Sequence, residues 1–497
     1  MNLVQINYTK MVVFILFHGG RVFSGRRIFT GGFLLVLALT GCATGVPGDA
    51  GVVSRRPPSG LQSPSAPTGP ITSGELPALD ESSELDDYLA YAALNNPGLE
   101  AAFNRWKAAV ERVPQAEALP DPQLTYAYYI REVETRVGPQ QQRIGLKQMF
   151  PWFGVRDLRG DAAMQTAQAA EQRYRAAKLK LFRRVRDAYY EYNYLGRAIG
   201  IVREQRDLLR YMVRVLRERY RVGDAGYADL IRAQVELGKL EDRLRALEDL
   251  RDPAAARLNA ALNRPVAAPV PWPAGVPHRM LDAGDEEVLA WMEEGNPELE
   301  ALRHEVMRED AGILLARKEY FPDVTLGLDY IDTDDALMPG TPDSSKDPVI
   351  AMLSLNLPIW RGKLDAGVRE ARARRRAAVA ARSERVNGLR AEVKMVLYKV
   401  RDAERRMLLY RNTLVPKARQ SLKASQTAFR AGTATFLEVL DAVRALLEFE
   451  LSYERALADH VQRLAELEML VGRELPLSEK DPIRRLQTVE EGNEQHE

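Results

Sequence analysis

Four short stretches of the chain alternate apolar and polar residues with the period of a β-strand. They are LTYAYYI at 124–130, RIGLKQM at 143–149, VTLGLDY at 324–330 and AMLSLNL at 351–357. In the first stretch Leu124 and Tyr126 share one face, while Thr125 and Ala127 share the other. The pattern therefore predicts two pairs of strands, each joined by a polar loop.

Alternation alone fits two environments for these strands. A soluble antiparallel sheet with one dry face and a membrane barrel give the same pattern. Four strands are too few to close a membrane barrel, and open sheet edges are not tolerated in lipid. A barrel would therefore require several copies of the chain, each donating four strands.

Long helical stretches surround the strand pairs. Shorter helices are expected over roughly 86–117 and 285–319. No proline interrupts Val155 to Tyr220, a length on the order of 100 Å if it is all helix. After a turn at Gly223, a second long helix is expected to run to about Leu262. The second half follows the same plan with its turn at Gly432, and Pro416 is expected to kink the helix before that turn.

The same short phrases occur twice in the same order along the chain. The pairs of copies are Asn96-Pro97-Gly98-Leu99-Glu100-Ala101 with Asn296-Pro297-Glu298-Leu299-Glu300-Ala301, Pro120-Asp121 with Pro322-Asp323, Phe150-Pro151-Trp152-Phe153-Gly154 with Leu357-Pro358-Ile359-Trp360-Arg361-Gly362, and Arg221-Val222-Gly223 with Arg430-Ala431-Gly432. This order predicts a two-fold internal repeat.

The repeat divides the chain into segments. The first repeat spans 86–264 with its tip near 221–226, and the second spans 285–475 with its tip near 430–435. A Pro-rich linker, 265–284, joins them, and a polar tail, 476–497, follows. The fold class expected is mainly α with a small β part.

The N-terminal region has the features of a secretory signal. Arg26 and Arg27 precede an apolar run that ends in Leu39-Thr40-Gly41-Cys42. This pattern resembles a bacterial lipoprotein signal, in which the cysteine is lipidated, so 1–41 is expected to be the signal and Cys42 the anchor. Residues 1–20 form an unusually long lead, so the true translation start stays open. The Gly/Pro/Ser-rich stretch 42–85 is expected to be a flexible leader.

Composition excludes several other classes of function. The 497 residues carry a net charge of only +1, which gives no bias toward nucleic acid. Cys42 is the only cysteine, and the five histidines are scattered without metal-ligand spacing. No phosphate-binding loop or nucleophile elbow is present. We therefore expect no enzyme activity, no cofactor and no metal site.

The repeated motifs, in this order and each present twice, resemble those of TolC-type outer-membrane efflux channels. The resemblance is to the lipoprotein branch that works with resistance-nodulation-division pumps in particular. The Asn-Pro-x-Leu-Glu helix starts, the stretch Gln148 to Gly154 and the phrase Gly432-Thr433 with Leu437-Glu438-Val439-Leu440-Asp441 carry the resemblance, which covers about 86–475.

The resemblance implies a homotrimer in the outer membrane of a Gram-negative bacterium. Three chains would form a twelve-stranded transmembrane β-barrel in contact with membrane lipid, continued by an α-barrel of long hairpins into the periplasm. It implies two partners, a periplasmic adaptor protein and an inner-membrane resistance-nodulation-division transporter. The function implied is a gated passive conduit.

The resemblance also assigns roles to residues at the tips. Glu438 and Asp441 fall on an acidic ring at the family's tip constriction, and Asp229 matches an acid that locks the resting tip. The residues expected to meet the adaptor are Arg221, Gly223, Arg430 and Gly432. The lock's two partner positions are Phe429 and Ala434 in this chain, so the same lock cannot form, and Arg232 or Arg430 are the candidate substitutes.

Two other interpretations stay compatible with the sequence. A periplasmic coiled-coil lipoprotein could act as an adaptor or spacer without spanning the membrane, and a cytosolic coiled-coil scaffold is disfavoured by the signal. Glu438 and Asp441 could also be ordinary acids at a helix start. The sequence does not distinguish metal cations from drugs or other small molecules as the transported substrate.

Overall fold

A computed structural model describes residues 79–273, 275–276 and 278–478 of the chain. They all belong to one compact unit, Ser73–Glu497. The signal segment expected at 1–41, the anchor Cys42, most of the leader expected at 42–85 and the tail from residue 479 lie outside the described residues.

The first half of this unit contains a run of short helices, two strands and a long helical hairpin. Its elements are α1 (Leu85–Asn95), α2 (Pro97–Val110), α3 (Arg112–Glu117), β1 (Gln123–Val133), β2 (Gln140–Phe150), α4 (Val155–Arg221), α5 (Tyr227–Asp249) and α6 (Arg251–Leu262). The unbroken helix predicted from Val155 is confirmed as α4, whose 67 residues span about 100 Å.

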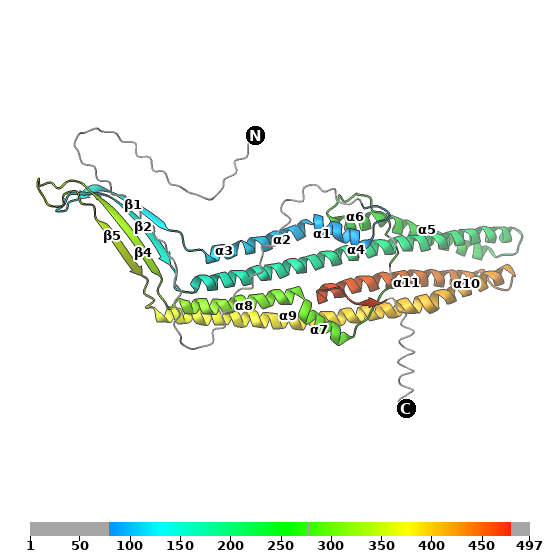
Figure 1. The fold of residues 1–497 in the computed structure, drawn as a ribbon. Coiled ribbons are helices and arrows are strands. Elements are labelled where there is room, and N and C mark those ends of the chain that lie inside the picture. The colour runs from blue at the N-terminus through cyan, green and yellow to red at the C-terminus, as the bar shows by residue number, and fades with distance from the viewer. Residues whose placement is uncertain (1–78, 274, 277, 479–497) are drawn as a thin grey trace, which may run out of the picture. The chain divides into compact units, whose positions relative to one another are not determined.

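The second half has the same order of main elements. They are β3 (Met280–Leu281), α7 (Asp285–Gly295), α8 (Pro297–Lys318), β4 (Val324–Thr333), β5 (Val349–Leu355), α9 (Arg361–Leu409), a π-helical turn η1 (Tyr410–Leu414), α10 (Val415–Arg430), α11 (Phe436–Val471) and β6 (Leu477–Ser478). Figure 1 lets the reader follow both halves along the chain.

Three helices expected to be continuous are divided. The helices expected at 86–117 and 285–319 each break at an Asn-Pro pair, and the return helix of the first hairpin breaks at Leu250. Pro253 lies in the first turn of α6, where its missing N–H leaves no broken hydrogen bond. Helical composition continues across these prolines, but each proline lies in the first turn of a new helix.

The four predicted strands are confirmed, and they form one sheet in the order β1-β2-β4-β5. All neighbours are antiparallel, and the central pair β2–β4 joins the two halves, with Ile144 opposite Tyr330 and Leu146 opposite Leu328. The sequence predicted each strand pair but not this joining. The edges of the sheet are β1 and β5.

The two Asn-Pro phrases each fasten two helices together. The side chain of Asn296 accepts hydrogen bonds from the backbone N–H groups of Glu298 and Leu299, at 2.8 and 3.1 Å, which caps α8. Its amide also donates to the carbonyl of Leu470 near the end of α11, at 2.8 Å. Asn96 caps α2 and donates to Ala261 of α6 in the same way. The motif therefore ties each short helix to the end of a hairpin.

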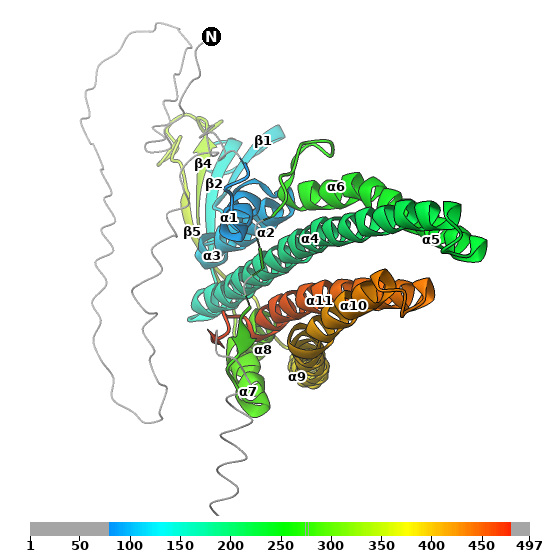
Figure 2. The same cartoon turned by 90° about the vertical axis from the view of Figure 1, so that its right-hand side faces the viewer.

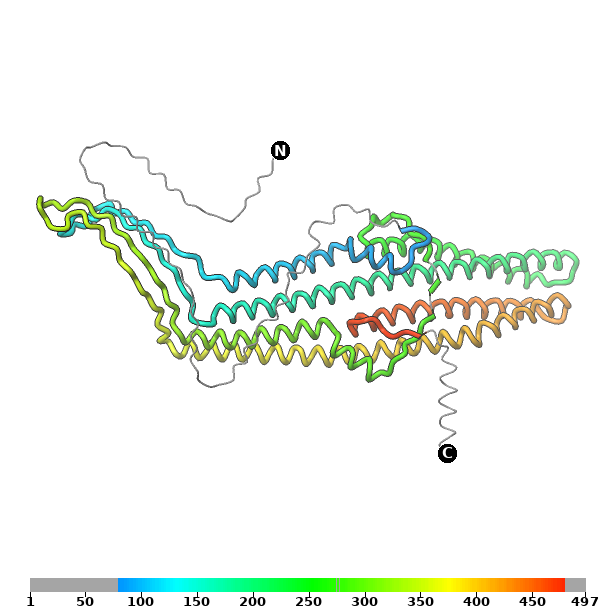
Figure 3. Tube along the Cα trace, viewed as in Figure 1, coloured from blue at the N-terminus to red at the C-terminus, as the bar shows by residue number. Residues whose placement is uncertain are grey.

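The hairpins pack against each other along α4 and α11, which lie side by side (Figure 2). An apolar core near the tips contains residues from α4, α5, α10 and α11. Both turns, residues 222–226 and 431–435, come at the same end of the helices (Figure 3). Because α4 starts at the sheet and ends at a tip, about 100 Å of helix separates the two.

Replacing Asn296 should destabilise the fold. Asn296→Ala removes the cap of α8 and leaves the buried carbonyl of Leu470 without its donor, a loss of about 1–3 kcal/mol. We expect a lower midpoint of thermal unfolding in detergent. Asn387→Ala, on an exposed position of α9, is the matched control and should leave the midpoint unchanged. Equal midpoints for both variants would contradict this role of Asn296.

Candidate functional site: the sheet faces and the hairpin tips

One face of the four-stranded sheet is apolar and exposed in the single chain. It carries residues that the alternation predicted, among them Leu124, Ile130, Leu328 and Leu353, together with Val349 at the start of β5. Leu124 is 74% exposed and Ile130 is 94% exposed. A continuous apolar face of this size is not left in water by a soluble protein. It marks a surface that contacts lipid or another apolar partner.

The opposite face of the sheet is polar and contains an ion pair. Arg143 on β2 binds Asp329 on β4, whose carboxylate is almost fully buried. Gly145 lies directly opposite Asp329 in the strand pairing, and a Cβ at this position would come within 2.1 Å of the Asp329 carboxylate. The glycine therefore leaves room for the Asp329 carboxylate beside the backbone of β2.

Among the described helices, none combines the length and apolarity needed to cross a membrane.

The two hairpin turns have the same backbone geometry. Gly223 and Gly432 have positive φ values, 78° and 74°. Asp224 N–H donates to Arg219 O and Thr433 N–H to Ala428 O, at 2.8 and 2.9 Å. These are Schellman caps, in which glycine supplies a left-handed conformation that side chains disfavour. The two Arg-x-Gly phrases are therefore the ends of two helices.

The structure places the two predicted ring acids on the exposed side of the start of α11. Glu438 forms a capping box with Thr435, whose hydroxyl donates to the Glu438 carboxylate at 3.0 Å. Asp441 is 63% exposed and lies 3.4 Å from Arg444. Each acid thus has a local role within one chain, and both remain open to solvent beside the tip.

The other predicted tip residues make contacts within their own helices. Asp229 pairs with Arg232 at 3.5 Å, and Arg221 pairs with Glu218 at 3.1 Å. The side chain of Arg232 is therefore directed to its own helix rather than to the other hairpin. Arg430 contributes its backbone carbonyl, rather than its side chain, to a contact between the hairpins.

Two arginines that the sequence pattern did not single out connect the hairpins. Arg219 of α4 donates to the carbonyls of Phe429 and Arg430 at the end of α10, at 3.1 and 3.2 Å. Arg444 of α11 binds Glu236 of α5 through two hydrogen bonds, at 3.1 and 2.6 Å. No motif marks these residues, because each contact joins segments more than 200 positions apart.

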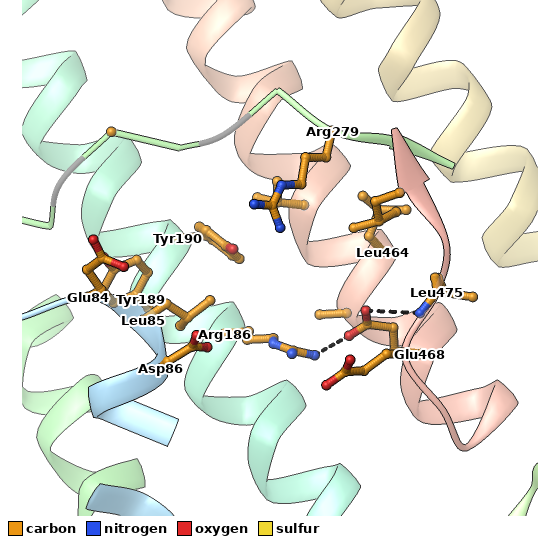
Figure 4. A pocket seen from close by; sticks show the side chains of 15 residues that line it. Glu84, Leu85, Asp86, Arg186, Tyr189, Tyr190, Arg279, Leu464, Glu468 and Leu475 are labelled. Atoms are coloured by element: carbon orange, nitrogen blue, oxygen red, sulfur yellow. Dashed lines mark hydrogen bonds and ion pairs between the residues drawn. The ribbon is translucent and has the colours of Figure 1, made fainter. Parts of the chain in front are cut away.

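A polar cavity of about 640 Å³ lies between α1, α4 and α11 (Figure 4). Arg186 of α4 binds Glu468 of α11 across it, and Glu468 accepts a hydrogen bond from the backbone of Leu475. Glu84, Asp86 and Arg279 lie around its rim. The ion pair of Arg186 with Glu468 therefore joins the two halves of the chain at this cavity, so the role of the cavity is structural.

Known proteins share this arrangement of sequence and structure. The family of outer membrane efflux proteins matches residues 89–264 and 291–473. The cobalt-zinc-cadmium resistance protein CzcC of Cupriavidus metallidurans is 22% identical over 406 residues, which are 78% of this chain and 90% of CzcC. The pyoverdine export outer membrane protein OpmQ of Pseudomonas putida is 23% identical over 474 residues, 88% of this chain and 96% of OpmQ.

Solved structures share the fold. The outer membrane protein VceC of Vibrio cholerae superposes with a TM-score of 0.65 at 20% identity, covering 79% of this chain and 97% of VceC. Because the two matched segments make up most of the chain, the chain belongs to the outer membrane efflux protein family. The family predicted from the repeated phrases is confirmed, and so is the mainly helical fold with a small sheet.

The Glu236–Arg444 pair should stabilise the tips at neutral and mildly acidic pH. The hydrogen bond from Arg444 lowers the pKa of Glu236 from its usual 4.5. A lowered folded-state pKa means that the stabilisation is present above the usual value and is lost as pH falls through the lower one. Glu236→Gln should therefore lower the unfolding midpoint by the same amount from about pH 8 to about pH 5, and the difference should vanish in stronger acid.

The control for this measurement is Glu241→Gln. Glu241 pairs with Arg210 at 2.6 Å, but both side chains are nearly half exposed, so water screens the pair. We expect a smaller effect than for Glu236, whose side chain is only 14% exposed. A Glu236→Gln midpoint equal to that of the parent protein at neutral pH would contradict a stabilising role for the pair.

Proposed function

We propose that the protein is the outer-membrane channel of a tripartite efflux system, a gated passive conduit. The exposed apolar face of the sheet is the observation that carries this proposal. At membrane depth such a face contacts lipid, while the face with Arg143 and Asp329 lines an aqueous lumen. A periplasmic spacer would have no use for an apolar sheet face, so the adaptor or spacer alternative is set aside.

Three copies of the chain would close the sheet. The free edges β1 and β5 cannot remain unpaired in lipid, and pairing β5 of one copy with β1 of the next gives twelve strands from three four-stranded sheets. The helices repeat this layout: α2 packs on α4, α4 on α8 and α8 on α9, which leaves α2 and α9 at the two edges. Pairing of α9 of one copy with α2 of the next would therefore close the helices into an α-barrel that continues the β-barrel. The two similar halves would be an internal repeat.

Near the tips α5 and α10 are the outer helices, because α5 packs on α4 and α10 on α11. Copies that close into a tube would therefore meet along α5 and α10 at this end.

The remaining parts of the assembly follow from the proposed role. A lipid at Cys42 would anchor the chain in the outer membrane, with the leader as a tether. The tips, including Arg221, Gly223, Arg430 and Gly432, would meet a periplasmic adaptor protein, and an inner-membrane resistance-nodulation-division transporter would supply the energy. CzcC and OpmQ are named for unlike cargoes, metal cations and pyoverdine, so we assign no cargo class.

Glu438 and Asp441 would set the ion preference of the channel. They lie three positions apart on one exposed helix face, so three copies would place six carboxylates at the tip opening. Asp229 would lie beside this opening. The test is the reversal potential of the purified protein in a planar bilayer under a salt gradient.

We expect cation preference in the parent protein and a weaker preference in Glu438→Gln with Asp441→Asn. Glutamine can keep the capping box that alanine would lose, so the change removes charge without removing the cap. Glu448→Gln, an exposed acid farther along α11, is the matched control. An unchanged reversal potential would remove both acids from the gate, and a protein that forms no channels at all would refute the proposed function.

A further inference from the structure

The resting tip needs a contact that holds the two hairpins together. The family's own lock cannot form in this chain, because Phe429 and Ala434 occupy its partner positions. Neither candidate substitute, Arg232 or Arg430, reaches across with its side chain in the structure. Arg219 does reach across, from the last turn of α4 to the end of α10.

We propose that Arg219, bound to the end of α10, is the latch that holds the tip of this channel closed. This inference rests on the proposed function as a gated channel. We define the Arg219 latch as the guanidinium of Arg219, the ring of Phe429 and the carbonyls of Phe429 and Arg430.

The latch binds a helix end rather than an acidic side chain. The last carbonyls of a helix lack partners within it and carry the negative end of its dipole. Arg219 donates one hydrogen bond to each of two such carbonyls, at 3.1 and 3.2 Å. A planar guanidinium presents two donors in a fixed fork, so both contacts form from one side chain.

An aromatic contact adds to these hydrogen bonds. The guanidinium lies 4.6 Å from the ring centre of Phe429, within the range of a cation–π interaction. Phe429 is itself buried and packs edge-on against Phe436 of α11. The phenylalanine that removes the family's lock thus forms one side of the new latch. Asp224 lies 3.6 Å from the Arg219 Nε and helps to orient it.

The two hairpins differ in their capacity to move. The outgoing helix of the first, α4, is continuous over 67 residues. The outgoing helix of the second is interrupted by η1, directly before Pro416 in the first turn of α10. A π-helical turn followed by proline is a common position for a helix to bend. Release of the latch would remove its polar contacts between α4 and α10, and η1 is the position about which α10 would bend.

The test is single-channel recording of the purified protein in planar bilayers, with the open-to-closed ratio as readout. Loss of two charge-assisted hydrogen bonds should raise this ratio in Arg219→Ala by about ten-fold or more. Arg219→Lys should fall between the parent and Arg219→Ala, because lysine keeps the charge but lacks the planar fork. The matched control is Arg217→Ala, which removes an exposed arginine from the same end of α4 and should leave the ratio unchanged.

The outcomes separate the latch from the proposed function. Channels that form normally but show the parent ratio in Arg219→Ala overturn the latch and leave the channel function intact. An absence of conductance from the parent and from every variant overturns the proposed function itself. Should Arg219→Ala fail to assemble, Arg219→Lys decides: a raised ratio supports the latch, and the parent ratio overturns it.

Discussion

The proposed assembly depends on one constraint, the need to pair every backbone polar group that lies in lipid. The sheet has a lipid-compatible face but two open edges, β1 and β5, so a single chain cannot satisfy the constraint. In the proposed assembly, closure by identical copies would satisfy it and would enclose the polar face around Arg143 and Asp329. The helices that continue the sheet would then enclose the same lumen, and the long α4 would carry it about 100 Å from the strands to the tips.

The tips combine a fixed geometry with breakable contacts. Glycine-dependent caps end both outgoing helices in the same way, so the turns are rigid and alike. Near the tips the hairpins share an apolar core, and two arginines, Arg219 and Arg444, add polar contacts between them. A gate requires this combination, because the parts that move must stay folded while the contacts between them break.

Much of this architecture could be predicted from the sequence because its signals are local. The alternation at 124–130 or 324–330, the absence of proline through α4 and the glycines at the turns each act within a few residues. The joining of β2 to β4 and the bond from Arg219 to the end of α10 could not be predicted, since both link distant segments. At the acids the structure adds a local role to the one suggested by resemblance: Glu438 caps its own helix, and Asp441 lies beside Arg444.

The central claim is that copies of this chain close a common barrel and tube. Electron microscopy of the mature protein, purified in detergent, tests it most directly. The account predicts three-fold end views with a central opening and side views with a helical shaft on the order of 100 Å. A monomeric particle, or particles without a central opening, would contradict it, because the edges of the sheet would then have no partner.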